Sequence, residues 1–153
     1  MRPLTTCFAL LASALVPFSS AAPGQSAELA VIVNPSSPVL RLEATELEAI
    51  FTSVRRSWSG GDAIVAFSYP PDHALRLEFD GVVLRLTPSE VGRFWVDQRI
   101  RADRRPPRQV SEPSLALRLV ARMGGGIAYV PAGLVTPDVR VVARIRNGEV
   151  VGP

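Results

Sequence analysis

Two segments of the chain carry side chains that could bind a small anion. Residues 34–37 read Asn-Pro-Ser-Ser and follow a short apolar run, and residues 68–76 begin with Ser and Tyr and end with Arg76. Amide, hydroxyl and guanidinium groups donate the hydrogen bonds that oxyanions accept, and a helix start adds backbone N–H donors. The candidate ligand-binding residues are therefore Asn34, Ser36, Ser37, Ser68, Tyr69, Asp72, Arg76 and, in a later apolar run, Tyr129.

Hydrophobic periodicity predicts the elements that position these residues. Strands are expected at residues 29–33, 63–68, 127–130 and 139–145, and helices at residues 44–53, 72–83, 87–98 and 111–124. Strands that alternate with helices indicate a single α/β domain with a mostly parallel sheet and helices on both faces. Near the C-terminus, Asn147 and Gly148 favour a tight turn, and we expect the tail beyond it to be irregular.

Capping residues predict where three of the helices begin. Thr87 and Glu90 have the spacing of a capping box, and Pro88 stands at the first helical position between them. Asp72 and Ser111 are the expected N-caps of the helices before and after it.

The ends of the strands are expected to form the binding edge. In open α/β sheets, the carboxyl ends of parallel strands meet at one edge, where ligands bind. Residues 34–37, residues 68–72 and Tyr129 would then lie together. Two alternatives remain open: residues 34–37 could simply form a turn, and Tyr129 could belong to the core.

Three motifs resemble a known family when taken in order. They are Glu-Leu-Glu-Ala-Ile-Phe at residues 46–51, Trp58 followed by Gly-Gly-Asp at residues 60–62, and Gly-Gly-Ile-Ala-Tyr-Val at residues 125–130. Their order and spacing resemble the periplasmic phosphate-binding proteins of ABC importers, over about residues 29–131. The resemblance implies a single lobe of the periplasmic-binding-protein type that binds phosphate or another small oxyanion without a cofactor.

The chain departs from that family where the ligand should bind. The family's second strand leads into Arg-x-Asp-x-Ser-Gly-Thr, whereas residues 68–75 read Ser-Tyr-Pro-Pro-Asp-His-Ala-Leu. Two prolines remove two N–H donors, and Asp72 places a carboxylate where an anion would bind. We therefore expect a degenerate phosphate site. Arg76 could restore some affinity, or it could pair with Asp72 at the i, i+4 spacing and only steady the helix.

The first 22 residues have the features of a secretory signal peptide. Arg2 precedes a mostly apolar run at residues 4–18, and Ser-Ser-Ala-Ala follows at residues 19–22. The apolar run is too short to span ~30 Å of hydrocarbon, so an integral membrane protein is not expected. We expect residues 23–153 to form the exported domain, in the periplasm or outside the cell. The only cysteine, Cys7, lies in the signal peptide.

Catalysis, metal binding and nucleic-acid binding are not expected from these residue types. His73 is the only histidine, and neither a catalytic triad nor a set of metal ligands is evident. The formal net charge is only +3, and acidic residues interrupt the basic segment at residues 99–108. That segment is interpreted as a solvated loop or as a surface that docks an anion or a partner.

Two functions therefore remain after the sequence analysis. The first is an exported solute-binding or sensing module with a degenerate phosphate site. The second is an interaction domain that has lost its ligand and docks to a membrane transporter, a sensor or an envelope protein.

Overall fold

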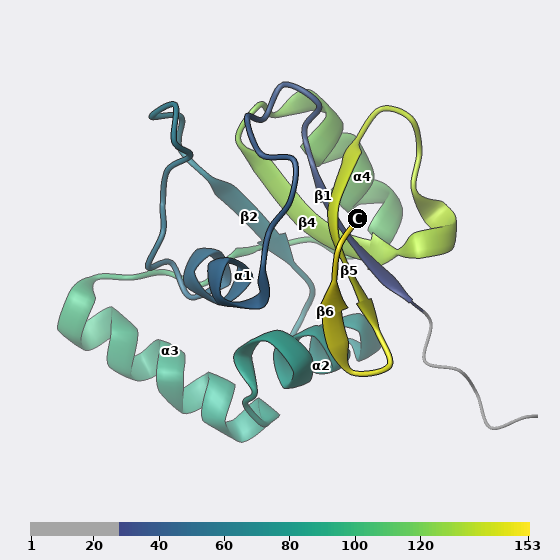
Figure 1. Ribbon diagram of the computed structural model, residues 1–153. Helices are drawn as coiled ribbons and strands as arrows, with labels where there is room; N and C mark the ends of the chain where they lie inside the picture. Colours follow the sequence, from purple (N-terminus) through teal and green to yellow (C-terminus); the bar gives the residue numbers. More distant parts are fainter. Residues whose placement is uncertain (1–27) are drawn as a thin grey trace, which may run out of the picture.

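The computed structural model describes residues 28–153, which form a six-stranded sheet with helices packed on both faces (Figure 1). The strands occur in the spatial order β3-β2-β4-β1-β5-β6. Their bounds are β1 Leu29–Val33, β2 Val65–Ser68, β3 Arg108–Gln109, β4 Gly126–Pro131, β5 Arg140–Arg146 and β6 Glu149–Val151. The expected signal peptide, residues 1–22, lies outside the described residues.

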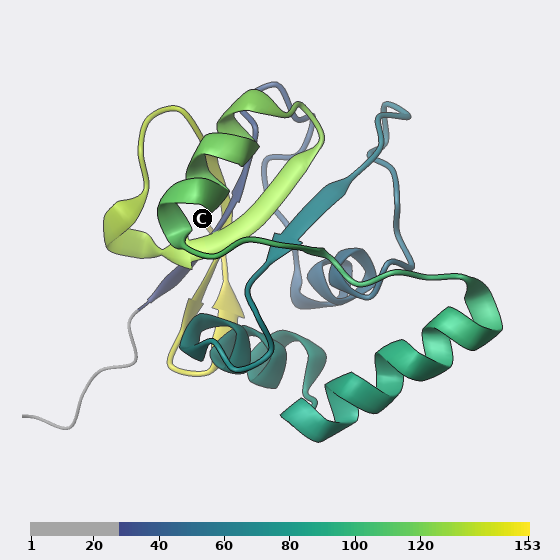
Figure 2. The same ribbon diagram turned by 180° about the vertical axis from the view of Figure 1, so that it is seen from behind.

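The helices confirm the expectation that both faces of the sheet are covered. Their bounds are α1 Ala44–Phe51, α2 Ala74–Phe79, α3 Pro88–Ala102 and α4 Pro113–Arg122, with a π-helical turn η1 at Asp80–Leu84 and a 3-10 turn η2 at Ala132–Leu134. Figures 1 and 2 show α4 on one face and α1 with α2 on the other. Among the described residues, no helix is both long and apolar enough to cross a membrane.

The α/β lobe agrees with the sequence prediction, but the expectation of a mostly parallel sheet is wrong. The central strand β1 is antiparallel to both of its neighbours, β4 and β5, and β6 is antiparallel to β5. Only β2 makes parallel pairs, with β3 and with β4. A pattern of alternating strands and helices reveals that strands exist, whereas their direction depends on pairing between residues that are distant in the sequence.

The core lies on the two faces of the central strands. All five residues of β1 are fully buried, which explains the continuous apolar sequence. On the face covered by α1 and α2, the ring of Phe79 stacks on that of Tyr129 with centroids 3.9 Å apart, and Phe51 packs against both. Trp58 is also buried in this core.

Two helix starts differ from the prediction by one residue, and one helix is longer than expected. The N-cap of α2 is His73 rather than Asp72, because its Nδ1 accepts a hydrogen bond from the backbone N–H of Leu75 (3.3 Å). The N-cap of α4 is Glu112 rather than Ser111. Helix α3 begins with the predicted capping box at Thr87 but continues to Ala102, into the expected basic loop.

The C-terminal tail is ordered, contrary to expectation. Asn147 and Gly148 adopt φ angles of 52° and 76°, the left-handed conformation that both central residues of a type I′ hairpin turn require. The turn brings β6 back alongside β5 and completes the edge of the sheet.

Candidate functional site

The candidate residues lie at opposite ends of the sheet instead of along one edge. Because β1 is antiparallel to β4, its carboxyl end meets the start of β4, where the N–H of Asn34 donates to the carbonyl of Gly126 (3.3 Å). The carboxyl end of β2 lies beside the later part of β4, where Ser68 meets Tyr129. The expected grouping of residues 34–37 with residues 68–72 is therefore wrong.

The turn at residues 34–37 uses its polar groups to fix the structure. The Asn34 amide donates to the carbonyls of Val120 (2.9 Å) and Ala121 (2.8 Å), so it satisfies the end of α4. Its Oδ1 accepts hydrogen bonds from both the backbone N–H and the hydroxyl of Ser36. The hydroxyl of Ser37 accepts from the N–H of Val39. The Asn34 side chain thus has both amide hydrogens engaged within the fold.

Ser68, Tyr69 and Tyr129 form one buried hydrogen-bond network. The hydroxyl groups of Ser68 and Tyr129 are 2.7 Å apart, and the Tyr69 hydroxyl donates to the Tyr129 carbonyl (2.9 Å). Burial raises the pKa of both tyrosines above the usual value, because the phenolate would have to be desolvated. The structure brings these three candidates together, as a core network.

The β2–α2 turn, residues 69–73, contains the candidate residue Asp72 and the only histidine, His73. Asp72 is exposed, and His73 stacks on Tyr69 with ring centroids 4.5 Å apart. His73 is only partly exposed, because its ring both caps α2 and covers Tyr69.

Arg76 pairs with Asp80 rather than with Asp72. Its Nε lies 3.1 Å from Asp80 Oδ2, and its Nη1 donates to the Tyr69 carbonyl (2.9 Å). Both side chains of the pair are largely buried. Burial raises the pKa of the Asp80 carboxyl, and the neighbouring Arg76 guanidinium offsets part of that increase.

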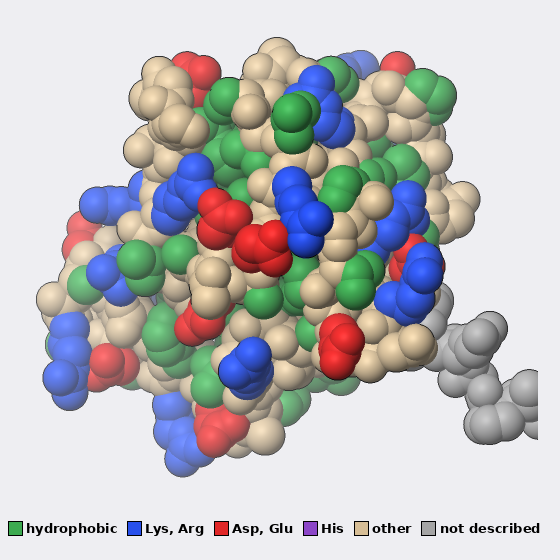
Figure 3. Space-filling model, in the orientation of Figure 1, with side chains coloured by type: hydrophobic (Ala, Val, Ile, Leu, Met, Phe, Trp, Pro, Cys, Tyr) green, Lys and Arg blue, Asp and Glu red, His purple; other side chains and the backbone are tan. Residues whose placement is uncertain are grey.

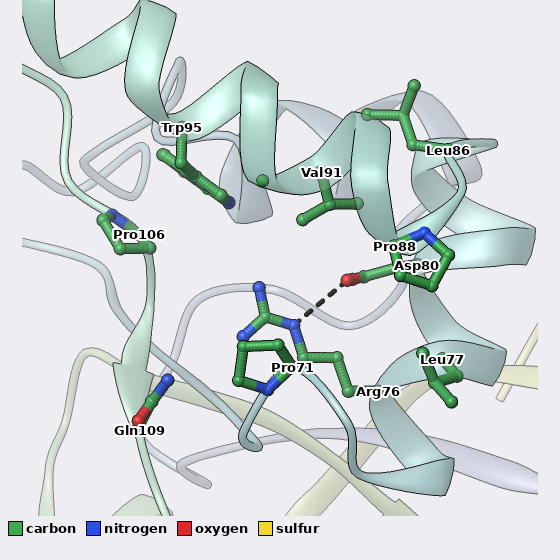
Figure 4. Close-up of a pocket in the computed structure, with 11 residues that line it drawn as sticks. Pro71, Arg76, Leu77, Asp80, Leu86, Pro88, Val91, Trp95, Pro106 and Gln109 are labelled. Atoms are coloured by element: carbon green, nitrogen blue, oxygen red, sulfur yellow. Dashed lines mark hydrogen bonds and ion pairs between the residues drawn. The ribbon is translucent and has the colours of Figure 1, made fainter.

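This ion pair lies in the wall of a cavity of about 230 Å³ between α2, α3 and the segment leading to β3 (Figure 4). The other walls are mainly apolar and comprise Pro71, Leu77, Leu86, Val91, Trp95 and Pro106. Figure 4 shows the guanidinium of Arg76 extending from α2 into this space, with Trp95 and Gln109 on the far side. Arg76 is thus the one predicted site residue that lines this cavity.

Sequence reasoning missed the partners of Arg76 in this cavity. Asp80 stands four residues after Arg76, a spacing that could have indicated the pair as readily as that of Asp72. Trp95 is partly buried and packs against the core, while it also lines the cavity. No pattern in the sequence indicated Gln109, because its proximity to Arg76 depends on the path of the chain between α3 and β3.

The basic segment at residues 99–108 is divided between α3 and an extended stretch. Within it, Arg101 pairs with Asp97, and Arg104 donates to the side chain of Gln98 (2.8 Å). Figure 3 shows acidic and basic side chains interspersed over the visible face. This distribution agrees with the small net charge of the chain.

Comparisons with known proteins identify the fold. The sequence matches no protein-family model and no curated protein. An ABC-type phosphate transport receptor from Vibrio cholerae superposes with a TM-score of 0.61 at 18% identity, over 78% of this chain and 47% of the receptor. PstS from Borrelia burgdorferi superposes with a TM-score of 0.60 at 12% identity, over 76% of this chain and 47% of PstS.

A third structure, from Clostridium perfringens, was solved with bound phosphate and is described as a phosphate ABC transporter substrate-binding protein. It superposes with a TM-score of 0.60 at 20% identity, over 78% of this chain and 46% of its own. The lobe therefore has the fold of phosphate-transport binding proteins, as the motifs implied. The chain spans about half the length of these structures.

Proposed function

We propose that this chain is an exported solute-binding or sensing module, without enzymatic activity, whose phosphate site is degenerate. Its fold is that of substrate-binding proteins of phosphate transport. One observation supports the loss of the phosphate site: the β2–α2 turn contains Pro70 and Pro71, while Arg76 is turned inward to the Tyr69 carbonyl and Asp80.

The energetics of the turn support weak phosphate binding. Charge-assisted hydrogen bonds contribute roughly 1.5–3 kcal/mol each when they are buried, and less when water reaches them. The two prolines contribute no N–H donor, and the exposed carboxylate of Asp72 repels a divalent anion. We therefore expect a phosphate affinity no tighter than roughly millimolar, about −4 kcal/mol.

Isothermal titration of the exported domain with phosphate and with sulfate at low salt tests this proposal. Asp72→Ser should strengthen phosphate binding, because it removes the repulsive charge and adds a hydroxyl donor. Asp138→Ser is the matched control, since Asp138 is also exposed but lies just before β5. Micromolar phosphate binding by the unaltered chain would contradict a degenerate site.

An interaction domain that docks to a membrane transporter, a sensor or an envelope protein is the second candidate. One observation favours it: helix α3 exposes two large apolar side chains, Val96 (62% exposed) and Ile100 (79%), one turn apart. The genes next to this one distinguish the candidates, since importer permeases would support solute binding and a sensor kinase would support docking. Crosslinking from position 100 in the periplasm would then identify the partner.

A further inference from the structure

We propose that the cavity beside Arg76 binds a small organic monocarboxylate with an apolar body. This inference rests on the proposed solute-binding function but concerns a cavity that the phosphate-binding resemblance does not explain. It begins from a charged group that the fold leaves incompletely satisfied. Arg76 is only 7% exposed, and its Nε and Nη1 are engaged by Asp80 and by the Tyr69 carbonyl.

The third guanidinium nitrogen is available to a ligand. Within residues 28–153, Nη2 of Arg76 has no hydrogen-bond partner, although the guanidinium extends into the cavity (Figure 4). Because the residue is only 7% exposed, its guanidinium is less fully hydrated than one on the open surface. An acceptor placed in the cavity would therefore gain more from Nη2 than from an exposed arginine.

The polar groups opposite Arg76 are further donors. Figure 4 shows the indole nitrogen of Trp95 and the side-chain nitrogen of Gln109 on the side that faces the guanidinium. The Asp80 oxygen that faces Arg76 already accepts from Nε. A ligand that suits this arrangement accepts several hydrogen bonds and donates few, as a carboxylate does.

The charge and shape of the cavity select against phosphate. The carboxylate of Asp80 lies in the same wall and repels a dianion about twice as strongly as a monoanion, so the cavity favours a monocarboxylate over the divalent form of phosphate. Its walls are mainly apolar, and they would leave the remaining oxygens of a phosphate without partners. The volume of about 230 Å³ lies below the range of about 300–1,000 Å³ typical of drug-sized ligands. A small carboxylate attached to a ring or a branched chain fits these conditions.

Titration with benzoate, followed through the two indole N–H resonances, tests the proposal. Trp95 lines the cavity, whereas Trp58 is buried in the core and serves as an internal control. We expect benzoate to shift the Trp95 resonance in a saturable manner and to leave that of Trp58 in place. Benzamide has the same shape without the charge, and we expect its affinity to be at least about tenfold weaker than that of benzoate.

Two variants assign the effect to the cavity. Replacing both members of the ion pair, Arg76→Met with Asp80→Leu, removes the guanidinium without leaving a buried charge, and it should abolish the saturable shift. Arg93→Met removes an exposed arginine of α3 and should leave benzoate binding unchanged. Gln109→Ala should weaken benzoate binding, and it still tests the cavity if the double variant does not fold.

Three outcomes would overturn the proposal: a Trp95 resonance that does not respond to benzoate, equal binding of benzamide, or unchanged affinity in Gln109→Ala. Each is independent of the phosphate titration. Weak phosphate binding with no benzoate binding would refute only the monocarboxylate cavity, whereas micromolar phosphate binding would refute the degenerate phosphate site.

Discussion

Arg76 occupies a position in which a positive charge is costly unless several groups satisfy it. Two of its nitrogens are engaged inside the fold, and its carboxylate partner, Asp80, is 9% exposed. A buried ion pair of this kind is often no more stable than apolar residues of similar volume, because both ions lose hydration. Stability alone therefore does not explain the pair, in agreement with a role in the cavity.

The ion pair makes a specific prediction about stability. Arg76→Met should lower the free energy of unfolding by about 3–5 kcal/mol, because it leaves the Asp80 carboxylate buried without its partner. The double variant Arg76→Met/Asp80→Leu should recover most of this loss. Urea denaturation of the three proteins measures both effects, and a double variant no more stable than the single one would contradict the argument.

The stability of the single variant Arg76→Met should also depend on pH. Burial raises the pKa of Asp80 in the folded chain above its ordinary value, so the folded state holds the proton more tightly than the unfolded state. Stability from such a group is present at low pH and is lost as the pH rises through the folded-state pKa. The loss in free energy of unfolding caused by Arg76→Met should therefore be largest at neutral pH and should become smaller on acidification.

Gly125 provides a second prediction at the scale of one residue. A Cβ at this position would lie 1.9 Å from the backbone carbonyl oxygen of Ala63, so the chain there would have to shift. Gly125→Ala should destabilise the fold by about 1–3 kcal/mol or more. Gly124→Ala is the matched control, since its nearest contact would be the Ser36 hydroxyl oxygen at 3.4 Å. Equal thermal midpoints for the two variants would contradict this prediction.

Helix α3 illustrates how local signals can define an element that packs only lightly. Val91 is its one buried residue, so its start depends strongly on the capping box. The Glu90 carboxylate accepts hydrogen bonds from the backbone N–H and from the hydroxyl of Thr87, each 2.7 Å long. These bonds also lower the pKa of Glu90.

Thr87→Ala should therefore reduce stability by about 0.5–2 kcal/mol. Ser111→Ala, at the residue wrongly predicted to cap α4, should change stability by less than about 0.5 kcal/mol. The pKa of Glu90 is lowered in the folded chain. The stability that Glu90 contributes is therefore present above the unfolded-state pKa and is lost as the pH falls through the folded-state pKa. The difference between Thr87→Ala and the unaltered chain should accordingly narrow in acid. Denaturation midpoints at neutral and acidic pH check both statements.

The sequence predicted those elements that are determined by nearby residues. The apolar run of β1 and the capping box of α3 both appear where expected, because each depends on residues within a few positions of one another. The antiparallel direction of β1 depends on its pairing with β4, about 100 residues later, and no local pattern encodes it. For the same reason, residues 34–37 could not be placed at the end of the sheet opposite Ser68.

At the scale of the whole molecule, the chain provides one lobe of a fold that occurs in proteins about twice as long. Its sheet is completed on one side by the β5–β6 hairpin. Two ion pairs join Glu28, the first described residue, to Arg144 (2.9 Å) and Arg146 (2.8 Å) of β5. These ion pairs tie the residue that precedes β1 to the neighbouring strand β5.

Export is the prediction that belongs to this scale. The positive start, the apolar run at residues 4–18 and the small residues at 19–22 predict cleavage after Ala21, because a cut after Ala22 would place Pro23 next to the scissile bond. Protein recovered from the periplasm should therefore begin at Ala22 or close to it when its N-terminus is sequenced. Ala21→Leu should leave the leader attached, because signal peptidase requires a small residue there, whereas Ala22→Ser should be processed normally. Protein that remains in the cytoplasm with Met1 intact would contradict export, and the proposed periplasmic function with it.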